Sequence, residues 1–306
     1  MKIAVLIPCF NEEATIEKVI LDFKQALPQA NIFVYDNNST DNSYIVAKRN
    51  GAIVKKEYRR GKGNVVRTMF LDIEADIYVM VDADDTYPAQ EVLTLIDPIV
   101  NCEADMCVGD RHSNGSYLQQ NKRMFHNFGN NLVVKLINTL YKENLKDIMS
   151  GYRAFNRDFV KHFPIHSGGF EIETEMSIHA LDKRFKIKEV PVSYKDREDG
   201  SVSKLNTYTD GYKILKTIFW LFKDYKPLMF FSIIAGVFFI FSLVAGVPVI
   251  VEFVRTHYIA KVPSAILAVG LMLISTMTLF IGFVLDTVTK QHKDNFELFR
   301  LNNKYK

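Results

Sequence analysis

Three aspartates directly follow an apolar stretch of the chain, at positions 82, 84 and 85. The stretch, 77–81, is rich in β-branched residues and has the length of a strand buried on both faces of a parallel sheet. Open α/β sheets bind their ligands at the carboxyl ends of such strands. Because the chain turns there, Asp82 and Asp84 can point toward one ion, and hard carboxylate oxygens suit Mg²⁺ or Mn²⁺. The alternative interpretation is a solvated acidic turn.

The composition limits the classes of function. The chain has 306 residues, enough for one large α/β domain and a smaller part. Its formal net charge of +3 gives no indication of a nucleic-acid partner. The three cysteines show no Cys-x-x-Cys spacing, so we expect them to be reduced and mostly buried. The sequence opens on a strand pattern at 3–7, which predicts that no signal peptide is present.

Two uncharged apolar segments follow Pro227, at 228–251 and 265–285. Each is long enough to cross a bilayer, and two in succession favour spanning helices over buried helices of a soluble protein. Lysines and arginines gather before the first segment and after the second, whereas the link 252–264 has only two. The positive-inside rule therefore predicts a cell-membrane protein whose preceding domain and both termini are cytoplasmic.

Strand and helix patterns alternate in the first half of the chain. The strand patterns fall at 3–7, 32–35, 52–56, 77–81 and 106–109, and the helical patterns at 14–27, 42–50, 64–73 and 91–100. Strands that alternate with helices form parallel βαβ units. The sequence therefore predicts an α/β fold with a doubly wound, mostly parallel sheet.

Two glycines surround Lys62 just before one of these helices. Neither the Walker pattern nor the Gly-x-Gly-x-x-Gly dinucleotide pattern is present, which excludes two common nucleotide-binding designs. A lysine at a helix N-terminus can still reach a diphosphate, helped by the helix dipole. The alternative is a flexible basic turn.

The second half departs from this alternation. We expect a long helix at 122–140, strands at 147–155 and 187–194, and a helix near 168–176 that carries Glu171, Glu173 and Glu175. Helical geometry places 171 and 175 on one face and 173 away from it. An amphipathic pattern at 208–222 leads into the first apolar segment. It fits a helix in the membrane interface, with a domain-capping helix as the alternative.

Polar motifs are spread over the whole part of the chain before the apolar segments. In order they are Ile7-Pro8-x-x-Asn11-Glu12, Asp36-Asn37-x-Ser39-x-Asp41, Gly61-Lys62-Gly63, Asp82-Ala83-Asp84, Ser150-Gly151-Tyr152-Arg153 and Arg197-x-x-Gly200-x-x-Ser203-Lys204-Leu205. In this combination the sequence resembles the GT-A glycosyltransferases of family 2, specifically the polyisoprenyl-phosphate branch that includes dolichol-phosphate mannose synthase. The two apolar segments resemble the tails of bacterial and archaeal members.

The resemblance implies roles for single residues. The nucleotide-sugar would contact Pro8, Asn11, Glu12, Asp36, Lys62, Asp82 and Ala83, with Asp36 reading the base. Asp82 and Asp84 would hold the metal ion. Arg123 and Arg153 would face the sugar-phosphate and acceptor, and Arg153, Arg197, Ser203 and Lys204 would contact the lipid phosphate. Asp147, Glu171 and Glu173 are candidates for orienting the sugar or assisting as a base.

Two adjacent positions depart from the family pattern. Many relatives continue the metal motif as Asp-x-Asp-Leu-Gln, whereas this chain has Asp85 and Thr86. Asp85 adds a metal ligand or caps the next helix, and the sequence leaves both roles open.

The predicted reaction is inverting transfer of a monosaccharide from a nucleotide-diphosphate sugar to a polyisoprenyl phosphate. The tail type favours a uridine donor, with glucose and N-acetylglucosamine as leading sugars and undecaprenyl or dolichyl phosphate as acceptor. Two rivals are a processive polysaccharide synthase and a non-catalytic membrane scaffold. The first expects more spans and a Gln-x-x-Arg-Trp motif, which is missing.

We expect four parts in the chain. They are a GT-A domain at 1–204, an interfacial helix at 205–227, two spanning helices within 228–290 and a cytosolic tail at 291–306. Two helices make a poor anchor alone, so a homo-oligomer in the bilayer is plausible.

Overall fold

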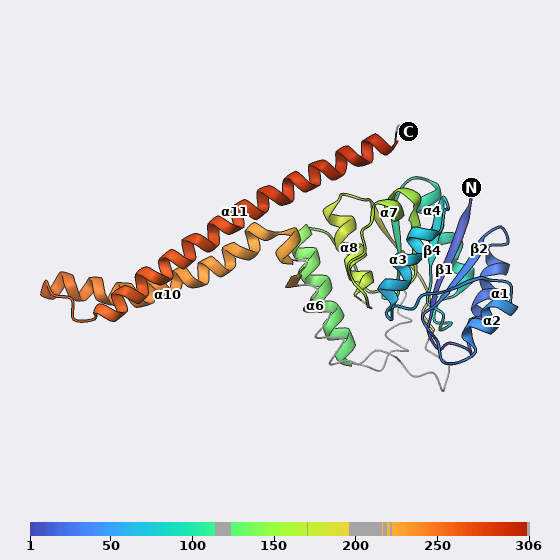
Figure 1. Ribbon diagram of the computed structural model, residues 1–306, viewed down its shortest axis with the longest axis horizontal. Helices are drawn as coiled ribbons and strands as arrows, with labels where there is room; N and C mark the ends of the chain where they lie inside the picture. The colour runs from blue at the N-terminus through green and yellow to red at the C-terminus, as the bar shows by residue number, and fades with distance from the viewer. Residues whose placement is uncertain (114–123, 170, 196–215, 217–218, 221, 305–306) are drawn as a thin grey trace. The chain divides into compact units, whose positions relative to one another are not determined.

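The chain forms two compact units, Met1–Leu215 and Lys216–Lys306. The structure is a computed structural model that describes residues 1–113, 124–169, 171–195, 216, 219–220 and 222–304. The first unit contains the sheet and its helices, and the second contains two long helices (Figure 1). Of the predicted interfacial helix at 208–222, most residues lie outside the described ones.

The first unit is built on a seven-stranded sheet in the order β3-β2-β1-β4-β6-β5-β7. The strands are β1 (Ile3–Cys9), β2 (Asn31–Asp36), β3 (Ile53–Lys56), β4 (Ile77–Met80), β5 (Met106–Asp110), β6 (Arg153–Asn156) and β7 (Ile187–Pro191). Every neighbouring pair is parallel except the two that include β6. This mixed, mostly parallel α/β sheet confirms the predicted fold class.

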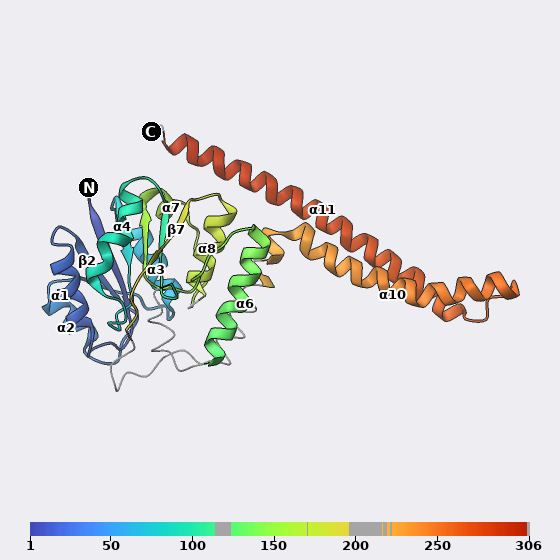
Figure 2. The ribbon, with the colours of Figure 1, turned by 180° about the vertical axis from the view of Figure 1, so that it is seen from behind.

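Helices cover both faces of the sheet, with α1 and α2 at one side and α7 and α8 at the other (Figures 1 and 2). The helices are α1 (Ile16–Ala26), α2 (Ser43–Arg49), α3 (Lys62–Asp72), η1 (Ala89–Glu91), α4 (Val92–Val100), α6 (Met124–Tyr141), α7 (Arg157–His162) and α8 (Ile172–Asp182). Alternate strand residues such as Val5 and Val79 join one core cluster with α1 and α4. On the other face Phe70 packs its ring against Tyr78 and Phe155.

The predicted strand at 147–155 is wrong in its first half, because β6 begins only at Arg153. Before it, the Tyr152 carbonyl still accepts from the Gly109 amide of β5 at 2.9 Å, but Gly151 and Ser150 bond to side chains. The amide of Gly151 donates to the Tyr87 hydroxyl at 3.2 Å, and the Ser150 carbonyl accepts from Arg153 Nε at 2.8 Å. Residues 147–152 therefore form a loop at the edge of the sheet.

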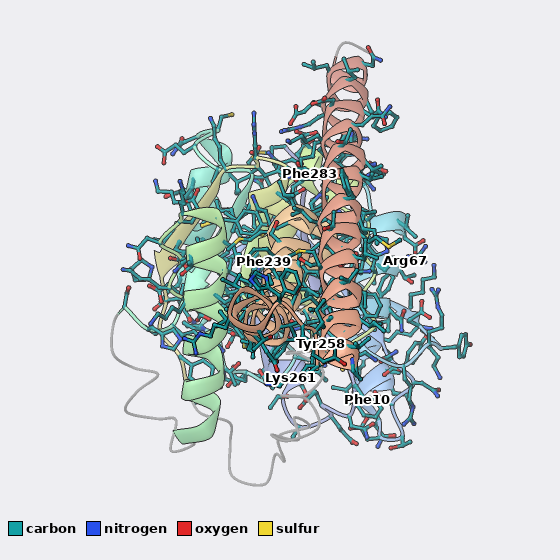
Figure 3. The ribbon with its side chains drawn as sticks, turned by 90° about the vertical axis from the view of Figure 1, so that its left-hand side faces the viewer. Phe10, Arg67, Phe239, Tyr258, Lys261 and Phe283 are labelled. Atoms are coloured by element: carbon teal, nitrogen blue, oxygen red, sulfur yellow. The ribbon has the colours of Figure 1, made fainter. Side chains whose placement is uncertain are left out.

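Two long helices make up the second unit, α10 (Pro227–Thr256) and α11 (Val262–Lys304). Both are long and apolar enough to cross a membrane. They pack against each other through small polar residues, since Ser242 Oγ donates to the Ala268 carbonyl and Ser275 Oγ to that of Ala235, each at 2.8 Å. Side-chain hydroxyls between helices and close small residues are typical of membrane packing. Figure 3 shows Phe239 on α10, Phe283 on α11, and Tyr258 and Lys261 on the link.

The second helix continues beyond the expected span. We expected a span at 265–285 and a tail at 291–306, but α11 continues as one helix of 43 residues to Lys304. At about 1.5 Å per residue such a helix is roughly twice as long as a hydrocarbon core of about 30 Å. Its last turns, unlike its first, are rich in charged residues.

Candidate active site

Three parallel strands end at one edge of the sheet and bring the first motifs together. Cys9 at the end of β1 is in register with Asp36 at the end of β2, and Leu6 pairs with Met80 at the end of β4. The carboxyl ends of parallel strands are the usual ligand-binding edge of an open α/β sheet. Asp36 ends β2, and Asn11 and Asp82 follow the ends of β1 and β4, so all three lie along the same edge.

The acidic loop follows β4 and is largely buried. Asp84 is only 6% exposed, whereas the Asp82 side chain keeps 29% of its surface. The Thr86 hydroxyl donates to Asp84 Oδ1 at 2.7 Å, and the Thr15 hydroxyl on the far side of the loop donates to the Ala83 carbonyl at 2.7 Å. The loop is thus held by side-chain hydroxyls from within and from the segment before α1.

Lys62 lies between two carboxylates from different elements. Its Nζ is 2.5 Å from Asp82 Oδ1 and 2.5 Å from Glu173 Oε1, and its side chain is 8% exposed. Burial by itself lowers the pKa of a lysine, but the attraction of Asp82 and Glu173 outweighs it, so that the pKa of Lys62 is raised. The ammonium therefore remains charged and joins α3, the acidic loop and α8.

The backbone approaches this ion pair too closely for a side chain. A Cβ at Gly151 would lie 2.5 Å from Asp82 Oδ2 and 3.0 Å from Lys62 Nζ. At the start of α3, a Cβ at Gly63 would overlap the Ser167 carbonyl. Only glycine at both positions lets the loops at 147–152 and 166–169 close around Lys62.

The predicted nucleotide pocket lies beyond β1 and β2. Asn11 has a positive φ of 52°, and its backbone amide donates to Ser39 Oγ at 2.9 Å. The backbone amide of Glu12 donates to Ser43 Oγ at 2.8 Å. Pro8 is paired in the sheet with Tyr35. Asp36 is 1% exposed; its Oδ2 accepts from the Ser39 amide at 3.2 Å, and its Oδ1 has no hydrogen-bond partner among the described residues.

Arg153 lies deeper than the sequence suggests. It is fully buried, and its guanidinium donates to the carbonyls of Ser150 and Ile148 and to Ser177 Oγ, the last at 3.0 Å. Burial lowers its pKa to about 10, so the group is still charged at neutral pH. These contacts favour a role in shaping the 148–151 loop over the predicted direct contact with substrate.

Asp147 is paired with an arginine that the sequence did not single out. Arg111 Nε and Nη2 donate to the two oxygens of Asp147 at 2.6 and 2.8 Å. Burial raises the pKa of Asp147, but the Arg111 guanidinium outweighs this and lowers it. A carboxylate of this kind is a weak proton acceptor, so the geometry favours an anchoring role. Arg111 follows β5 directly, and this position at a strand end is the signal that could have found it.

Several predicted site residues lie outside the described part of the chain. Arg123, Arg197, Ser203 and Lys204 are among them, and their assignments stay predictions. The chain enters the 196–215 stretch from Lys195, whose amide donates to the Thr86 carbonyl of the acidic loop at 3.0 Å. The described chain after β7 therefore ends beside the acidic loop.

The acidic loop suits a hard divalent ion that also binds phosphate. No group of three or more metal-ligating side chains occurs among residues that the structure describes. Mg²⁺ sites often use one or two carboxylates together with substrate phosphates and water. Asp82 and Asp84 supply such a pair, and the Lys62 ammonium contacts Oδ1 of Asp82. The oxygen donors present therefore fit the expected ion.

The family follows from comparison with known proteins. The family model described as Glycosyl transferase family 2 matches residues 4–163, more than half of the chain. The chain belongs to glycosyltransferase family 2. It is similar to glycosyltransferase AglJ of Haloferax volcanii, with 29% identity over 96% of each chain. It is also similar to the dolichyl-phosphate hexose transferase of the same organism, with 26% identity over 71% of this chain and 92% of the relative.

The fold is shared with solved structures. Glucosyl-3-phosphoglycerate synthase from Mycobacterium tuberculosis, in complex with Mn²⁺, uridine diphosphate and glucosyl-3-phosphoglycerate, matches with a TM-score of 0.60. The match covers 72% of this chain and 79% of that one at 21% identity, so it shows the fold alone. The predicted GT-A architecture is confirmed, and with the relatives it supports a hexosyltransferase.

The buried guanidinium gives a stability prediction. Arg153→Lys removes most of the guanidinium N–H donors, which bond to two carbonyls and one hydroxyl. We expect the free energy of unfolding to fall by about 3 kcal/mol. Calorimetric unfolding of the purified protein in detergent measures it. Arg157→Lys is the matched control, because Arg157 pairs with Glu74 at the surface, where its side chain is 60% exposed. An unchanged unfolding temperature for Arg153→Lys would contradict the anchoring role.

Proposed function

We propose that this glycosyltransferase moves a hexose from a uridine-diphosphate sugar to the phosphate of a polyisoprenyl lipid at the cytoplasmic membrane face. One observation carries the proposal: an acidic loop that suits a metal–diphosphate lies in a family 2 domain whose chain continues into two helices of membrane-spanning length. Relatives named for transfer to dolichyl phosphate support the lipid acceptor.

The donor would bind along the carboxyl ends of β1, β2 and β4. Asp36 Oδ1, a buried acceptor without a hydrogen-bond partner among the described residues, suits a ring N–H of the base. Pro8, Asn11 and Glu12 would line the base and ribose, and Ala83 would contact the nucleotide between the two metal-binding aspartates. A solved neighbour with the same fold binds uridine diphosphate, which supports a uridine donor over guanosine.

Asp82 and Asp84 would hold Mg²⁺ or Mn²⁺ against the diphosphate. When bound, the ion neutralises the charge that grows on the leaving diphosphate. Lys62, already between Asp82 and Glu173, adds a second positive charge at this place. Thr86 keeps Asp84 in one orientation through its hydroxyl. These residues stabilise the departing group and need not move a proton.

The acceptor phosphate needs no strong base. A phosphate monoester has its second pKa near 6, so at neutral pH it is already mostly an anion. Its direct attack on the anomeric carbon gives inversion of configuration. This agrees with Asp147, whose carboxylate is paired with Arg111, and with Glu173, which is paired with Lys62. The main task is to bring two anions together, for which Arg123, Arg197, Ser203 and Lys204 are the proposed phosphate contacts.

The two apolar helices would keep the catalytic domain at the membrane surface, where the phosphate of the lipid acceptor lies. We propose the division made from the sequence, with the GT-A domain at 1–204 and an interfacial segment at 205–227 before the hairpin. Lysines and arginines flank the hairpin on the side of the domain and the C-terminus. By the positive-inside rule both lie in the cytoplasm.

Asp84→Asn tests the reaction. Purified protein in detergent with Mg²⁺ or Mn²⁺, undecaprenyl phosphate and a panel of radiolabelled nucleotide sugars should transfer label from one donor into the organic phase. Asp84→Asn should lower the rate at least about 100-fold, because a ligand of the diphosphate-neutralising ion is lost. Asp97→Asn, exposed on α4, is the control and should keep the wild-type rate.

If the protein binds uridine nucleotides but forms no lipid-linked product from any donor, the lipid-acceptor proposal is contradicted. An equal rate for Asp84→Asn would instead remove the metal role and favour another arrangement of the site.

The proposed membrane topology can be tested by labelling cysteines, because the chain has one exposed cysteine of its own. Cys102 is exposed on the catalytic unit, whereas Cys9 and Cys107 are buried. Tyr258→Cys places a thiol on the link between the two helices, at a position 70% exposed. A membrane-impermeant maleimide should label Tyr258→Cys in intact cells, and the wild-type protein only after permeabilisation. Labelling of the wild type in intact cells would reverse the proposed orientation.

A further inference from the structure

Asp85, the third aspartate of the acidic loop, lies in the left-handed backbone region with a φ of 57°. Its side chain is only 8% exposed. Residues other than glycine are rare in this region, and aspartate and asparagine tolerate it best. A strained backbone at the edge of a candidate site calls for contacts that hold it there.

Two lysines from separate parts of the fold supply such contacts. Lys18 Nζ from α1 is 2.6 Å from Asp85 Oδ1, and Lys195 Nζ from the chain after β7 is 3.1 Å from Asp85 Oδ2. Each carboxylate oxygen therefore already faces an ammonium group. A carboxylate neutralised in this way is a poor additional ligand for a divalent ion, because two cations lie where that ion would have to bind.

The same contacts lead to the carboxylate of Asp84. The Lys195 amide donates to the Thr86 carbonyl at 3.0 Å, so Lys195 holds the loop by its side chain and its backbone together. The Thr86 hydroxyl in turn donates to Asp84 Oδ1 at 2.7 Å. A continuous path of bonds thus runs from the chain after β7 through Asp85 and Thr86 to Asp84.

We propose that Asp85 and Thr86 are positioning residues for the metal carboxylates, and that Asp85 acts through its ion pair with Lys195. The proposal rests on the proposed function, since it takes Asp82 and Asp84 as the metal-binding pair. It assigns physical roles to the two positions at which this chain departs from the family pattern. Asp85 neither ligates the ion nor caps the following helix; it fixes the loop that presents Asp84.

The direction in which metal affinity changes on removal of Lys195 distinguishes a positioning role from simple charge repulsion. Lys195 is a cation near a cation site, so removing its charge should strengthen metal binding if only long-range repulsion matters. If Lys195 holds the loop in place, removing it should weaken metal binding. The Lys195 side chain is 55% exposed, so its loss has little reason to unfold the protein.

The experiment measures Mn²⁺ binding in the presence of uridine diphosphate, by electron paramagnetic resonance on the full chain in detergent. Lys195→Met and Asp85→Asn should each weaken Mn²⁺ binding about threefold or more. Because the two residues act through one ion pair, the double variant should bind Mn²⁺ at least as tightly as the single variant that binds it more weakly. Thr86→Val should weaken it about tenfold, as for other groups that orient a metal ligand. Lys195→Arg, which keeps the pair, should bind Mn²⁺ like the wild type.

Lys188→Met is the matched control and should leave Mn²⁺ binding unchanged, because Lys188 pairs with Glu103 at the surface on β7. Tighter or equal binding by Lys195→Met, with the wild type binding Mn²⁺, would overturn the positioning role and leave the proposed function standing. A loss of bound Mn²⁺ in Asp85→Asn without any loss in Lys195→Met would make Asp85 a ligand, which also overturns it. A wild type that binds no Mn²⁺ with the nucleotide would overturn both proposals.

Discussion

The buried ammonium of Lys62 is the interaction on which the candidate site depends. It lies 2.5 Å from a carboxylate oxygen of Asp82 and 2.5 Å from one of Glu173, and it is nearly excluded from solvent. Each of these charges alone would be costly to bury, and a trio with one cation and two anions is tolerated only while all three stay in contact. The elements that carry them, α3, the loop after β4 and α8, are therefore held to one geometry. The glycines at 63 and 151 make the close approach possible.

The sequence predicted the sheet and its ligand edge well, because strand patterns such as 77–81 are simple and the residues after them are polar. It also singled out Lys62, Asp82 and Glu173 as candidates, although it did not predict that Lys62 bridges the other two. That contact joins residues 111 positions apart in the chain, and no local pattern encodes it. The burial of Arg153 was missed for the same reason: an arginine in a polar motif gives no sign that carbonyls of its own loop will surround it.

Some departures from local rules lie beside the candidate site. The loop at 147–152 has a strand-like composition, but its Gly151 amide and Ser150 carbonyl bond to the side chains of Tyr87 and Arg153. Asn11 and Asp85 adopt positive φ angles in the loops that follow β1 and β4. In the second unit, by contrast, apolar composition alone predicted the two long helices, and α11 continues past the expected span to Lys304. The charged residues at 290–304 do not stop the helix, since most of them are good helix formers.

Hydrogen–deuterium exchange of Lys62→Met against the wild type tests the central claim most directly. Without the ammonium, the carboxylates of Asp82 and Glu173 would face each other unneutralised, and the three elements should separate. We predict faster amide exchange at 82–88, at 147–152 and in the first turns of α8, with no change in β2 and β3. Faster exchange confined to the start of α3, or none at all, would contradict the view that Lys62 holds the site together.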